Sequence, residues 1–259
     1  MLLKDQVAIV SGIGPGLGQA IGLALAREGA AVVLAARGED KLRDLEQAIR
    51  SKGGRAIAVA TDISDPASCR NVVDKALSEF GAVDCLVNNA YHPGIYERIE
   101  TIDLDTWRAP FEINVLGTLR LSQAVIPSMK ERRSGSIVMI NSMSMRRMME
   151  MFGAYAASKA ALNVATQTLA LELGPYNIRV NSVMPGYIWG PPLKAYFDGE
   201  ATRAGITPKE VYDAVAAQTA LKTIPTSEEI AESVVFFASD MSRVITGQSL
   251  DVNAGHWFW

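Results

Sequence analysis

The sequence predicts an α/β fold in which one doubly wound parallel sheet of seven strands is covered by helices on both faces. Two observations predict it. Seven short apolar runs lack the polar alternation of half-exposed strands, as expected for strands buried on both faces. Longer segments with apolar residues at helical intervals separate these runs. The expected strands are residues 7–10, 31–35, 56–60, 85–87, 136–140, 180–184 and 250–252.

The expected helices include residues 17–28, 41–52, 67–80 and 155–173. Asp65 and Pro66 fit an N-cap and a first helical position. Residues 185–208 break the alternation, because they are rich in Pro, Gly and aromatic side chains and look too irregular for one core element. A long excursion after a strand is typical of an active-site lid, which we expect over about residues 186–220.

Composition narrows the class of protein. The 259 residues predict one domain, residues 1–259, that is large enough to bury a full core. A net charge of −3 argues against nucleic-acid binding. The absence of a signal segment or membrane-spanning run predicts a cytoplasmic protein. Cys69 and Cys85 lack metal-ligand spacing, so two reduced thiols and no metal site are expected.

A glycine-rich turn follows the first expected strand. Residues 11–18 read SGIGPGLG, in which Gly12, Gly16 and Gly18 have the spacing G-x-x-x-G-x-G rather than G-x-G-x-x-G. Glycines at a strand-to-helix turn let the backbone approach a pyrophosphate, whose charge lies against the N–H groups that begin the helix. The turn therefore predicts a dinucleotide site on a Rossmann-type sheet, with a purely structural turn as the alternative.

The end of the second expected strand indicates which dinucleotide is bound. Proteins that bind NAD(H) usually place an acid here to hold the adenosine ribose, whereas this chain has Ala36 followed by Arg37. A guanidinium can pair with a 2′-phosphate, and no carboxylate stands there to repel it. NADP(H) is therefore the preferred cofactor and NAD(H) the alternative, unless Arg37 only caps a solvent-facing turn.

Tyr155 and Lys159 have the spacing that puts two side chains on one face of a helix. An ammonium beside a phenol lowers its pKa, which predicts Tyr155 as a general acid/base. Ser142 follows the expected strand 136–140, at the edge where α/β sheets place their chemistry, and its hydroxyl can donate to a substrate carbonyl.

In this combination the chain resembles the compact members of the short-chain dehydrogenase/reductase family. The resemblance covers essentially the whole chain. The matching positions are the glycine turn of residues 11–18, Asp62-Ile63, Asn88-Asn89-Ala90, Asn114, Ser142, Tyr155 with Lys159, and Pro185-Gly186.

The resemblance implies a role for each position. Tyr155 would transfer the proton and Ser142 would polarise the carbonyl. Lys159 would bind the nicotinamide ribose, and Asn114 would hold a water that links Lys159 to solvent. Together with the turn and Arg37, the expected cofactor-binding residues are Ser11, Gly12, Gly14, Pro15, Gly16, Leu17, Gly18, Arg37, Asp62, Ile63, Asn89, Ala90, Tyr155, Lys159, Pro185, Gly186 and Ile188.

Four positions depart from the family pattern. Ser11 replaces a threonine but keeps the hydroxyl, and Pro15 stands where many NADP-dependent relatives have a basic side chain. Tyr91 replaces the glycine that ends the Asn-Asn-Ala-Gly motif, and Gly190 replaces a threonine that reaches the carboxamide of the nicotinamide.

The substrate residues are expected on both sides of the catalytic serine. Met143 and Met145 belong to a methionine cluster that suits an adaptable apolar pocket, with packing in a core edge or subunit interface as the alternative. Tyr187 and Trp189 lie in the expected lid, and they join Ser142 and Tyr155 as substrate residues. The aromatic tail, residues 256–259, is expected to be buried in a homotetramer or homodimer.

These observations predict reversible hydride transfer between NADP(H) and a bulky, apolar secondary alcohol or ketone of the hydroxysteroid-like, aromatic or alicyclic kind. One alternative is a 3-oxoacyl thioester reductase that acts on acyl carrier protein. Another is a cofactor-sensing regulatory protein of the same fold, although such a sensor would not require all four of Asn114, Ser142, Tyr155 and Lys159.

Overall fold

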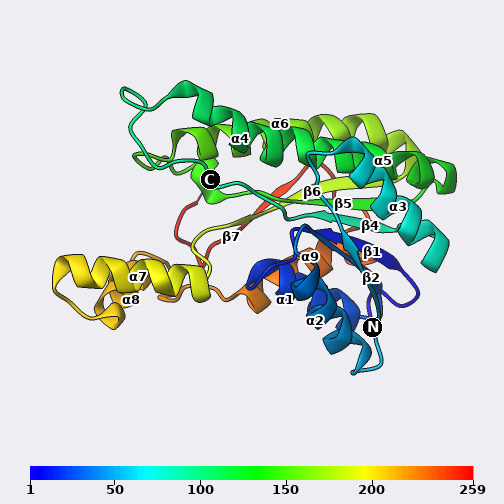
Figure 1. Cartoon of the computed structure of the whole chain (residues 1–259), viewed down its shortest axis with the longest axis horizontal. Helices are drawn as coiled ribbons and strands as arrows, with labels where there is room; N and C mark the ends of the chain where they lie inside the picture. The colour runs from blue at the N-terminus through cyan, green and yellow to red at the C-terminus, as the bar shows by residue number, and fades with distance from the viewer. Residues whose placement is uncertain (259) are drawn as a thin grey trace.

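The computed structural model of the chain describes residues 1–258, so Trp259 of the aromatic tail lies outside the described residues. A seven-stranded sheet with the order β3-β2-β1-β4-β5-β6-β7 forms its centre, and every neighbouring pair is parallel (Figure 1). This confirms the predicted fold class. The strands are β1 (Val7–Ser11), β2 (Ala31–Ala36), β3 (Arg55–Ala60), β4 (Cys85–Asn88), β5 (Gly135–Ile140), β6 (Ile178–Pro185) and β7 (Ser249–Val252).

Helices cover both faces of this sheet (Figure 1). One layer consists of α1 (Leu17–Arg27), α2 (Glu39–Arg50) and α9 (Ser227–Ala238). The other consists of α3 (Pro66–Phe80), α5 (Thr118–Arg132) and α6 (Gly153–Leu173). Shorter elements connect them: η1 (Leu104–Trp107), α4 (Arg108–Phe111), the π-helix η2 (Glu112–Gly117), η3 (Met143–Met145), η4 (Gly174–Tyr176) and η5 (Asp240–Ser242).

The strands contribute side chains to two separate hydrophobic cores, one on each face of the sheet. In β1, Ala8 and Val10 point into the core under α1, α2 and α9, whereas Val7 and Ile9 point into the core under α3, α5 and α6. Because alternate side chains of a strand point to opposite faces, a strand covered on both sides must be apolar at every position. This explains the unbroken apolar runs of the sequence.

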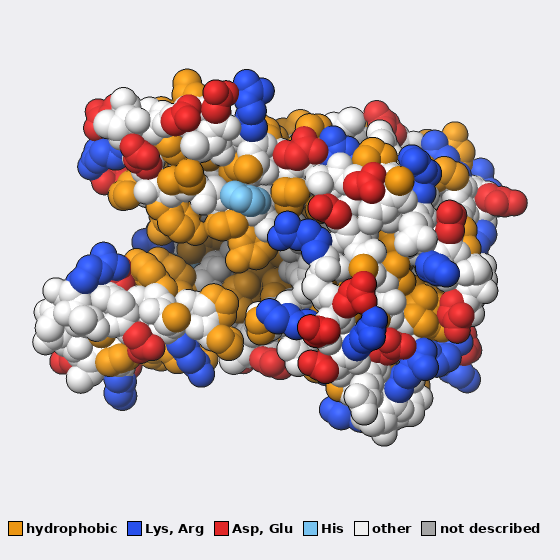
Figure 2. Space-filling model, viewed as in Figure 1, with side chains coloured by type: hydrophobic (Ala, Val, Ile, Leu, Met, Phe, Trp, Pro, Cys, Tyr) orange, Lys and Arg blue, Asp and Glu red, His pale blue; other side chains and the backbone are white. Residues whose placement is uncertain are grey.

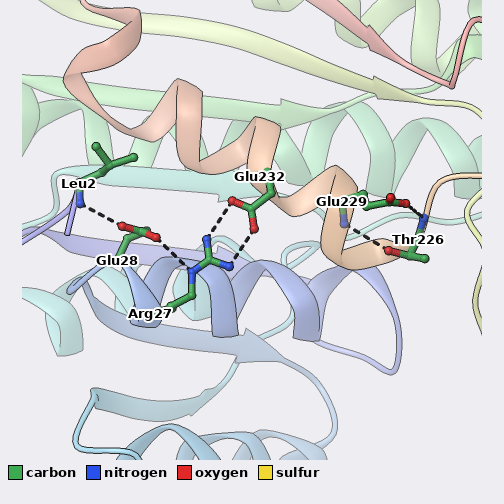
Figure 3. Close-up of polar contacts among 6 residues, drawn as sticks. All are labelled: Leu2, Arg27, Glu28, Thr226, Glu229 and Glu232. Carbon is green, nitrogen blue, oxygen red and sulfur yellow. Dashed lines mark hydrogen bonds and ion pairs between the residues drawn. The ribbon is translucent and has the colours of Figure 1, made fainter.

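Side chains at the helix ends fix where the helices begin and how they pack. Asp65 caps α3 by accepting from the backbone N–H groups of Ala67 and Ser68, with Pro66 at the first helical position, as predicted. Thr226 and Glu229 form a capping box that starts α9 (Figure 3). Arg27 on α1 then reaches Glu232 on α9 through two hydrogen bonds of 2.8 Å, which joins these two neighbouring helices (Figure 3).

The segment after β6 corrects one prediction. Residues 185–208 are not irregular, because they contain α7 (Pro191–Ala204) and lead into α8 (Pro208–Ala216). Proline is tolerated in the first turn of a helix, and here Pro191 starts α7 and Pro208 starts α8. Gly205 ends α7 in the left-handed conformation, at φ 68°. The Pro and Gly residues therefore mark helix ends.

Helices α7 and α8 project from the sheet as a pair (Figure 1). They have a small core of their own, in which Phe197, Ala216 and Ile224 are buried. Figure 2 shows a deep hollow, walled largely by hydrophobic side chains, between this pair and the layer that contains α4 and α6. Strand β6 ends toward this hollow, since the segment after it runs directly into α7.

Within residues 1–258, every helix is too short or too polar to cross a membrane. The same residues contain no group of three or more His, Cys, Asp or Glu side chains arranged to hold a metal ion. Cys69 and Cys85 are free and buried.

Candidate active site

The glycine turn after β1 is shaped by close packing against the segment after β4. Gly12 has a φ of 79°, and a Cβ there would lie 2.4 Å from the backbone nitrogen of Ala90. A Cβ at Gly18 would lie 2.3 Å from the carbonyl oxygen of Gly12. The amide of Asn89 donates to that same oxygen at 2.7 Å. Only glycine fits these two positions, whereas Gly14 has open space beside it and faces outward.

A groove of about 470 Å³ runs along this turn. Its walls bring together residues from the carboxyl ends of β1, β2, β3 and β4. The predicted residues that line it are Gly12, Gly14, Arg37, Asp62, Ile63, Asn89 and Ala90. The other residues of the turn, Pro15, Gly16, Leu17 and Gly18, continue from it into α1.

Two features of the groove suit a bound dinucleotide. A cradle that only glycine can form lies at the start of α1, where free N–H groups favour a phosphate. Ser11 at the end of β1 has a buried hydroxyl with no hydrogen-bond partner among residues 1–258. Buried polar groups are normally paired, so this hydroxyl suits contact with a bound ligand.

Charged groups stand at the far end of the groove. Arg37, Asp40 and Lys41 line it just after β2. Across from them, Asp62 accepts from the hydroxyl of Ser64 at 2.7 Å and from its backbone N–H at 2.9 Å. These hydrogen bonds, followed by the charge of Arg37, lower the pKa of Asp62. Asp62 is therefore held as a carboxylate that shapes its own turn.

Ser142, Tyr155 and Lys159 meet at the carboxyl end of β5. Ser142 follows the strand and begins η3, where its hydroxyl accepts from the backbone N–H of Ser144 at 3.2 Å. Tyr155 lies in the first turn of α6, and the side chain of Ser142 is close enough to lower the pKa of its phenol. The amine of Lys159 lies 5.7 Å from the centre of the Tyr155 ring and donates to the carbonyl of Ile140 at 2.8 Å.

Burial dominates the electrostatics of this trio. Burial raises the pKa of Tyr155, the nearby Ser142 side chain lowers it, and Tyr91 and Tyr96 raise it further. Burial also lowers the pKa of Lys159 to about 7. In this structure desolvation of the phenol is the largest cause and the lysine amine donates to Ile140, so the lowering of the Tyr155 pKa by Lys159 stays a prediction. At neutral pH Tyr155 is a protonated donor.

Asn114 is buried in the π-helix η2, an irregularity of the kind often found at functional sites. Its side chain accepts from the backbone N–H of His92 at 2.7 Å and donates to the carbonyl of His92 at 3.0 Å. It also donates at 2.9 Å to Ser158, whose hydroxyl donates to the carbonyl of Tyr155 at 2.7 Å. Asn114 thus ties the segment after β4 to the first turn of α6, and its water-holding role stays a prediction.

Three aromatic side chains that we did not predict as site residues surround Tyr155. Tyr91 and Phe152 present ring edges to it, with ring centres 6.4 and 6.5 Å away. Tyr96 packs on Phe152 at 4.6 Å. We call Tyr91, Tyr96 and Phe152 the aromatic wall. Only Tyr91 gave a signal in the sequence, as the residue that replaces a glycine after Asn-Asn-Ala.

The predicted substrate residues fall into two groups. Met143 is buried beside Ser142, and a Cβ at Gly186 would lie 3.2 Å from its sulfur, whereas Met145 is half-buried. Tyr187 and Trp189 both pack against Phe197 in the core of α7 and α8. Their structural role is to hold this helix pair, and their contact with substrate stays a prediction.

The residues between and around these positions complete the predicted site. Pro185 ends β6, and Gly186 packs against Met143 and Asn253. Ile188 is partly buried against the core under α1, α2 and α9. Its predicted place near the nicotinamide stays a prediction.

Comparison with known proteins agrees with this geometry. The family model described as enoyl-(acyl carrier protein) reductase matches residues 12–256. An uncharacterized oxidoreductase from Methylorubrum extorquens is 38% identical over 256 residues, which cover 98% of each chain. A trans-4-hydroxycyclohexanecarboxylate dehydrogenase from Sinomonas cyclohexanicum is 35% identical over 261 residues, covering 98% of this chain and 93% of the relative.

Solved structures show the same architecture. The crystal structure of an NAD⁺-bound xylitol dehydrogenase superposes with a TM-score of 0.89 at 30% sequence identity. The superposition covers 97% of this chain and 99% of that protein.

Proposed function

Because the chain belongs to the short-chain dehydrogenase/reductase family, we propose that it transfers hydride reversibly between NADP(H) and a bulky, apolar secondary alcohol or its ketone. Members of this family are oxidoreductases that act on CH–OH groups with NAD or NADP. The observation that carries the proposal is that the side chains of Ser142 and Tyr155 lie together beside the aromatic wall. It offers two hydroxyl groups to one oxygen atom and apolar rings to the remainder of a substrate.

The roles of the residues follow from their positions. The glycine turn and the groove would hold the dinucleotide, which supplies or accepts the hydride when bound. Ser142 and Tyr155 would both donate hydrogen bonds to the carbonyl oxygen, as in other sites that stabilise developing negative charge. Because Tyr155 is protonated at neutral pH, it would give its proton to that oxygen during reduction. Lys159 and Asn114 would position Tyr155 through the backbone of β5 and α6.

The substrate class is inferred from the surfaces beside these hydroxyl groups. The aromatic wall and Met143 present flat or adaptable apolar surfaces, which suit an alicyclic or aromatic ring better than a polyol. The relative from Sinomonas cyclohexanicum acts on a hydroxycyclohexanecarboxylate, which supports an alicyclic substrate for this chain.

The preference for NADP(H) rests on the end of β2. Ala36 leaves no acid at the strand end, and Arg37 and Lys41 both line the groove beyond it. Asp40 lies between them in sequence, so the two cations outnumber the one acid at this place, which suits a 2′-phosphate. The xylitol dehydrogenase with the similar fold binds NAD⁺, so the preference must be measured for this chain.

We also propose a cytoplasmic homotetramer, with a homodimer as the alternative. Val164 and Leu171 on α6 are 63% and 81% exposed, and Phe258 in the tail is 76% exposed. Exposed apolar groups of this size are typical of surfaces that a second subunit covers.

The test of the function is a panel of alicyclic, aromatic, steroidal and 3-oxoacyl thioester ketones, assayed with NADPH and with NADH. We expect turnover of cyclic ketones with NADPH, and a loss of at least about 100-fold in kcat for Tyr155→Phe with little change in NADPH binding. Turnover by Tyr155→Phe at the wild-type rate would contradict the mechanism. Turnover of the thioester alone would favour the acyl carrier protein reductase, and cofactor binding without turnover would favour the sensor.

A further inference from the structure

Arg147 follows the segment that contains Ser142, and the proposed reaction does not use it. It follows Ser142 by five residues, and its backbone N–H donates to the carbonyl of Met143 at 2.9 Å. Arg147 therefore lies one helical turn after Met143, which is buried beside Ser142. Arg147 is half-buried, in contrast to the exposed Met148 that follows it.

The Arg147 side chain joins three parts of the chain. Its guanidinium hydrogen-bonds to the ring of His256 in the tail, and it donates to Oε1 of Gln218, just beyond α8, at 3.3 Å. The ring of His256 stacks on Tyr187, with ring centres 5.7 Å apart. We call Arg147, His256 and Gln218 the Arg147 cluster. It connects the segment after β5, the tail after β7 and the residues just beyond α8, and through Tyr187 it reaches the segment after β6.

The positive charge of Arg147 has no acidic partner in the part of the chain that the structure describes. Its polar contacts there are an imidazole and an amide, and no ion pair joins it to Asp or Glu. The preceding residue differs, since Arg146 pairs with Asp251. On α8, which ends two residues before Gln218, Asp213 pairs with Lys209. These two carboxylates are therefore paired with other cations.

The imidazole does not compensate this charge. Burial, followed by the charge of Arg147, lowers the pKa of His256, so the ring is neutral at pH 7 and accepts a hydrogen bond from the guanidinium. A guanidinium carries more N–H donors than these two contacts use. A half-buried cation with free donors and no counter-charge is costly, and an anion bound beside it removes that cost.

From this geometry we infer that the Arg147 cluster binds a carboxylate on the substrate, which makes the substrate a cyclic hydroxy acid or oxo acid. The planar fork of a guanidinium matches the two oxygens of a carboxylate, whereas phosphate sites usually add further cations or helix N-termini. With the carbinol oxygen on Ser142 and Tyr155, the ring would lie over Met143 and the carboxylate would face Arg147. The inference rests on the proposed function and names its substrate class.

Kinetics on a matched pair of ketones test this inference. The pair is 4-oxocyclohexanecarboxylate and 4-oxocyclohexanecarboxamide, which differ mainly in charge. We expect Arg147→Gln to lower kcat/KM for the carboxylate by about 10- to 100-fold, the loss that follows when one charged hydrogen-bonded pair is removed, and to leave the carboxamide nearly unchanged. Arg147→Lys should restore part of the loss. Arg243→Gln removes an exposed charge before β7, at the amino end of the strand that His256 follows, and should change kcat/KM for neither substrate.

A binding measurement keeps the inference testable if no ketone is turned over, which would contradict the proposed function alone. Calorimetry with NADP⁺ present should show that cyclohexanecarboxylate binds to the wild type but not to Arg147→Gln, and that cyclohexanecarboxamide binds weakly to both. Three outcomes would overturn the inference. The first is an equal loss of kcat/KM for the charged and the neutral ketone together with a lower melting temperature, which would show that Arg147 only stabilises the fold. The second is equal binding of cyclohexanecarboxylate to the wild type and to Arg147→Gln. The third is binding of inorganic phosphate in place of the carboxylate.

Discussion

At the scale of single residues, Lys159 gives the most direct link between burial and measurable behaviour. Its amine is buried beside Ile140, and burial lowers its pKa to about 7 from 10.5. Between these two values the unfolded chain binds more protons than the native one, so the free energy of unfolding rises with pH across this window. Below pH 7 both states are protonated, and the cost of burying the charge is constant.

Substitution Lys159→Met should remove this dependence. Urea denaturation of both proteins, from about pH 6 to about pH 9.5, should show the variant more stable at neutral pH and the wild type recovering as the pH rises. Parallel stability curves for the two proteins would show that Lys159 remains charged in the native state.

Arg37 provides a second prediction at this scale. If its guanidinium holds the 2′-phosphate, Arg37→Ser should weaken NADPH binding by about 10- to 100-fold and leave NADH binding unchanged, because only NADPH carries the charge that Arg37 would pair with. Fluorescence titration with both cofactors measures the two affinities. The matched control is Arg43→Gln. Arg43 lies on α2, and its exposed charge pairs with Glu39. Equal weakening of both cofactors by Arg37→Ser would assign Arg37 a structural role.

The same residues show what the sequence can and cannot predict. The spacing of Tyr155 and Lys159 is set by the helix alone, so their shared face was predictable. The direction of the tyrosine pKa was not, because it depends on how deeply α6 is buried. The aromatic wall could not be predicted from the sequence either, because residues 91, 96 and 152 come together only through tertiary packing.

At the scale of elements, the strands were predictable because both sheet faces are covered, which makes each of them a continuous apolar run. Helices α7 and α8 were missed because their boundaries carry Pro and Gly, which occur in loops as often as at helix ends. Thr207 and Glu210, which form the capping box of α8, were the overlooked signal.

The packing of α7 and α8 leads to a prediction about the lid. Their core around Phe197 is separate from the two cores of the sheet, so damage to it should remain local. Phe197→Ala removes contacts that cost about 3–5 kcal/mol in a buried core, which should loosen the helix pair and raise the KM for the ketone. NADPH binding and the main unfolding midpoint should change little.

A matched core variant distinguishes this local effect from general damage. Phe237 is buried in the core under α1, α2 and α9, so Phe237→Ala should lower the main unfolding midpoint instead. Limited proteolysis should cut Phe197→Ala, but not Phe237→Ala, first within residues 186–220. If Phe197→Ala lowers the main midpoint as much as Phe237→Ala does, the helix pair is not an independent lid.

At the scale of the whole molecule, the apolar excess of the sequence has two kinds of location. Most of it lies in the two sheet cores and in the core of the helix pair. Part of the remainder is exposed, and two groups of exposed residues bear on the proposed assembly. One is on α6, where Val164 and Leu171 are seven residues apart and therefore lie on one helix face, and the other consists of Leu250 of β7 and Phe258 of the tail.

Two separate self-complementary surfaces allow a tetramer with two different interfaces. We expect sedimentation velocity to show a tetramer for the wild type and dimers for Leu171→Lys and for Phe258→Ser. Leu171→Lys puts a charge on the α6 surface, Phe258→Ser removes an apolar ring from the tail surface, and each change leaves the other surface intact. The double variant should sediment as a monomer. Ile206→Lys, which alters an exposed apolar residue in the turn between α7 and α8, should remain a tetramer. A monomeric wild type would contradict the proposed assembly, and the exposed residues of α6 and the tail would then be ordinary surface.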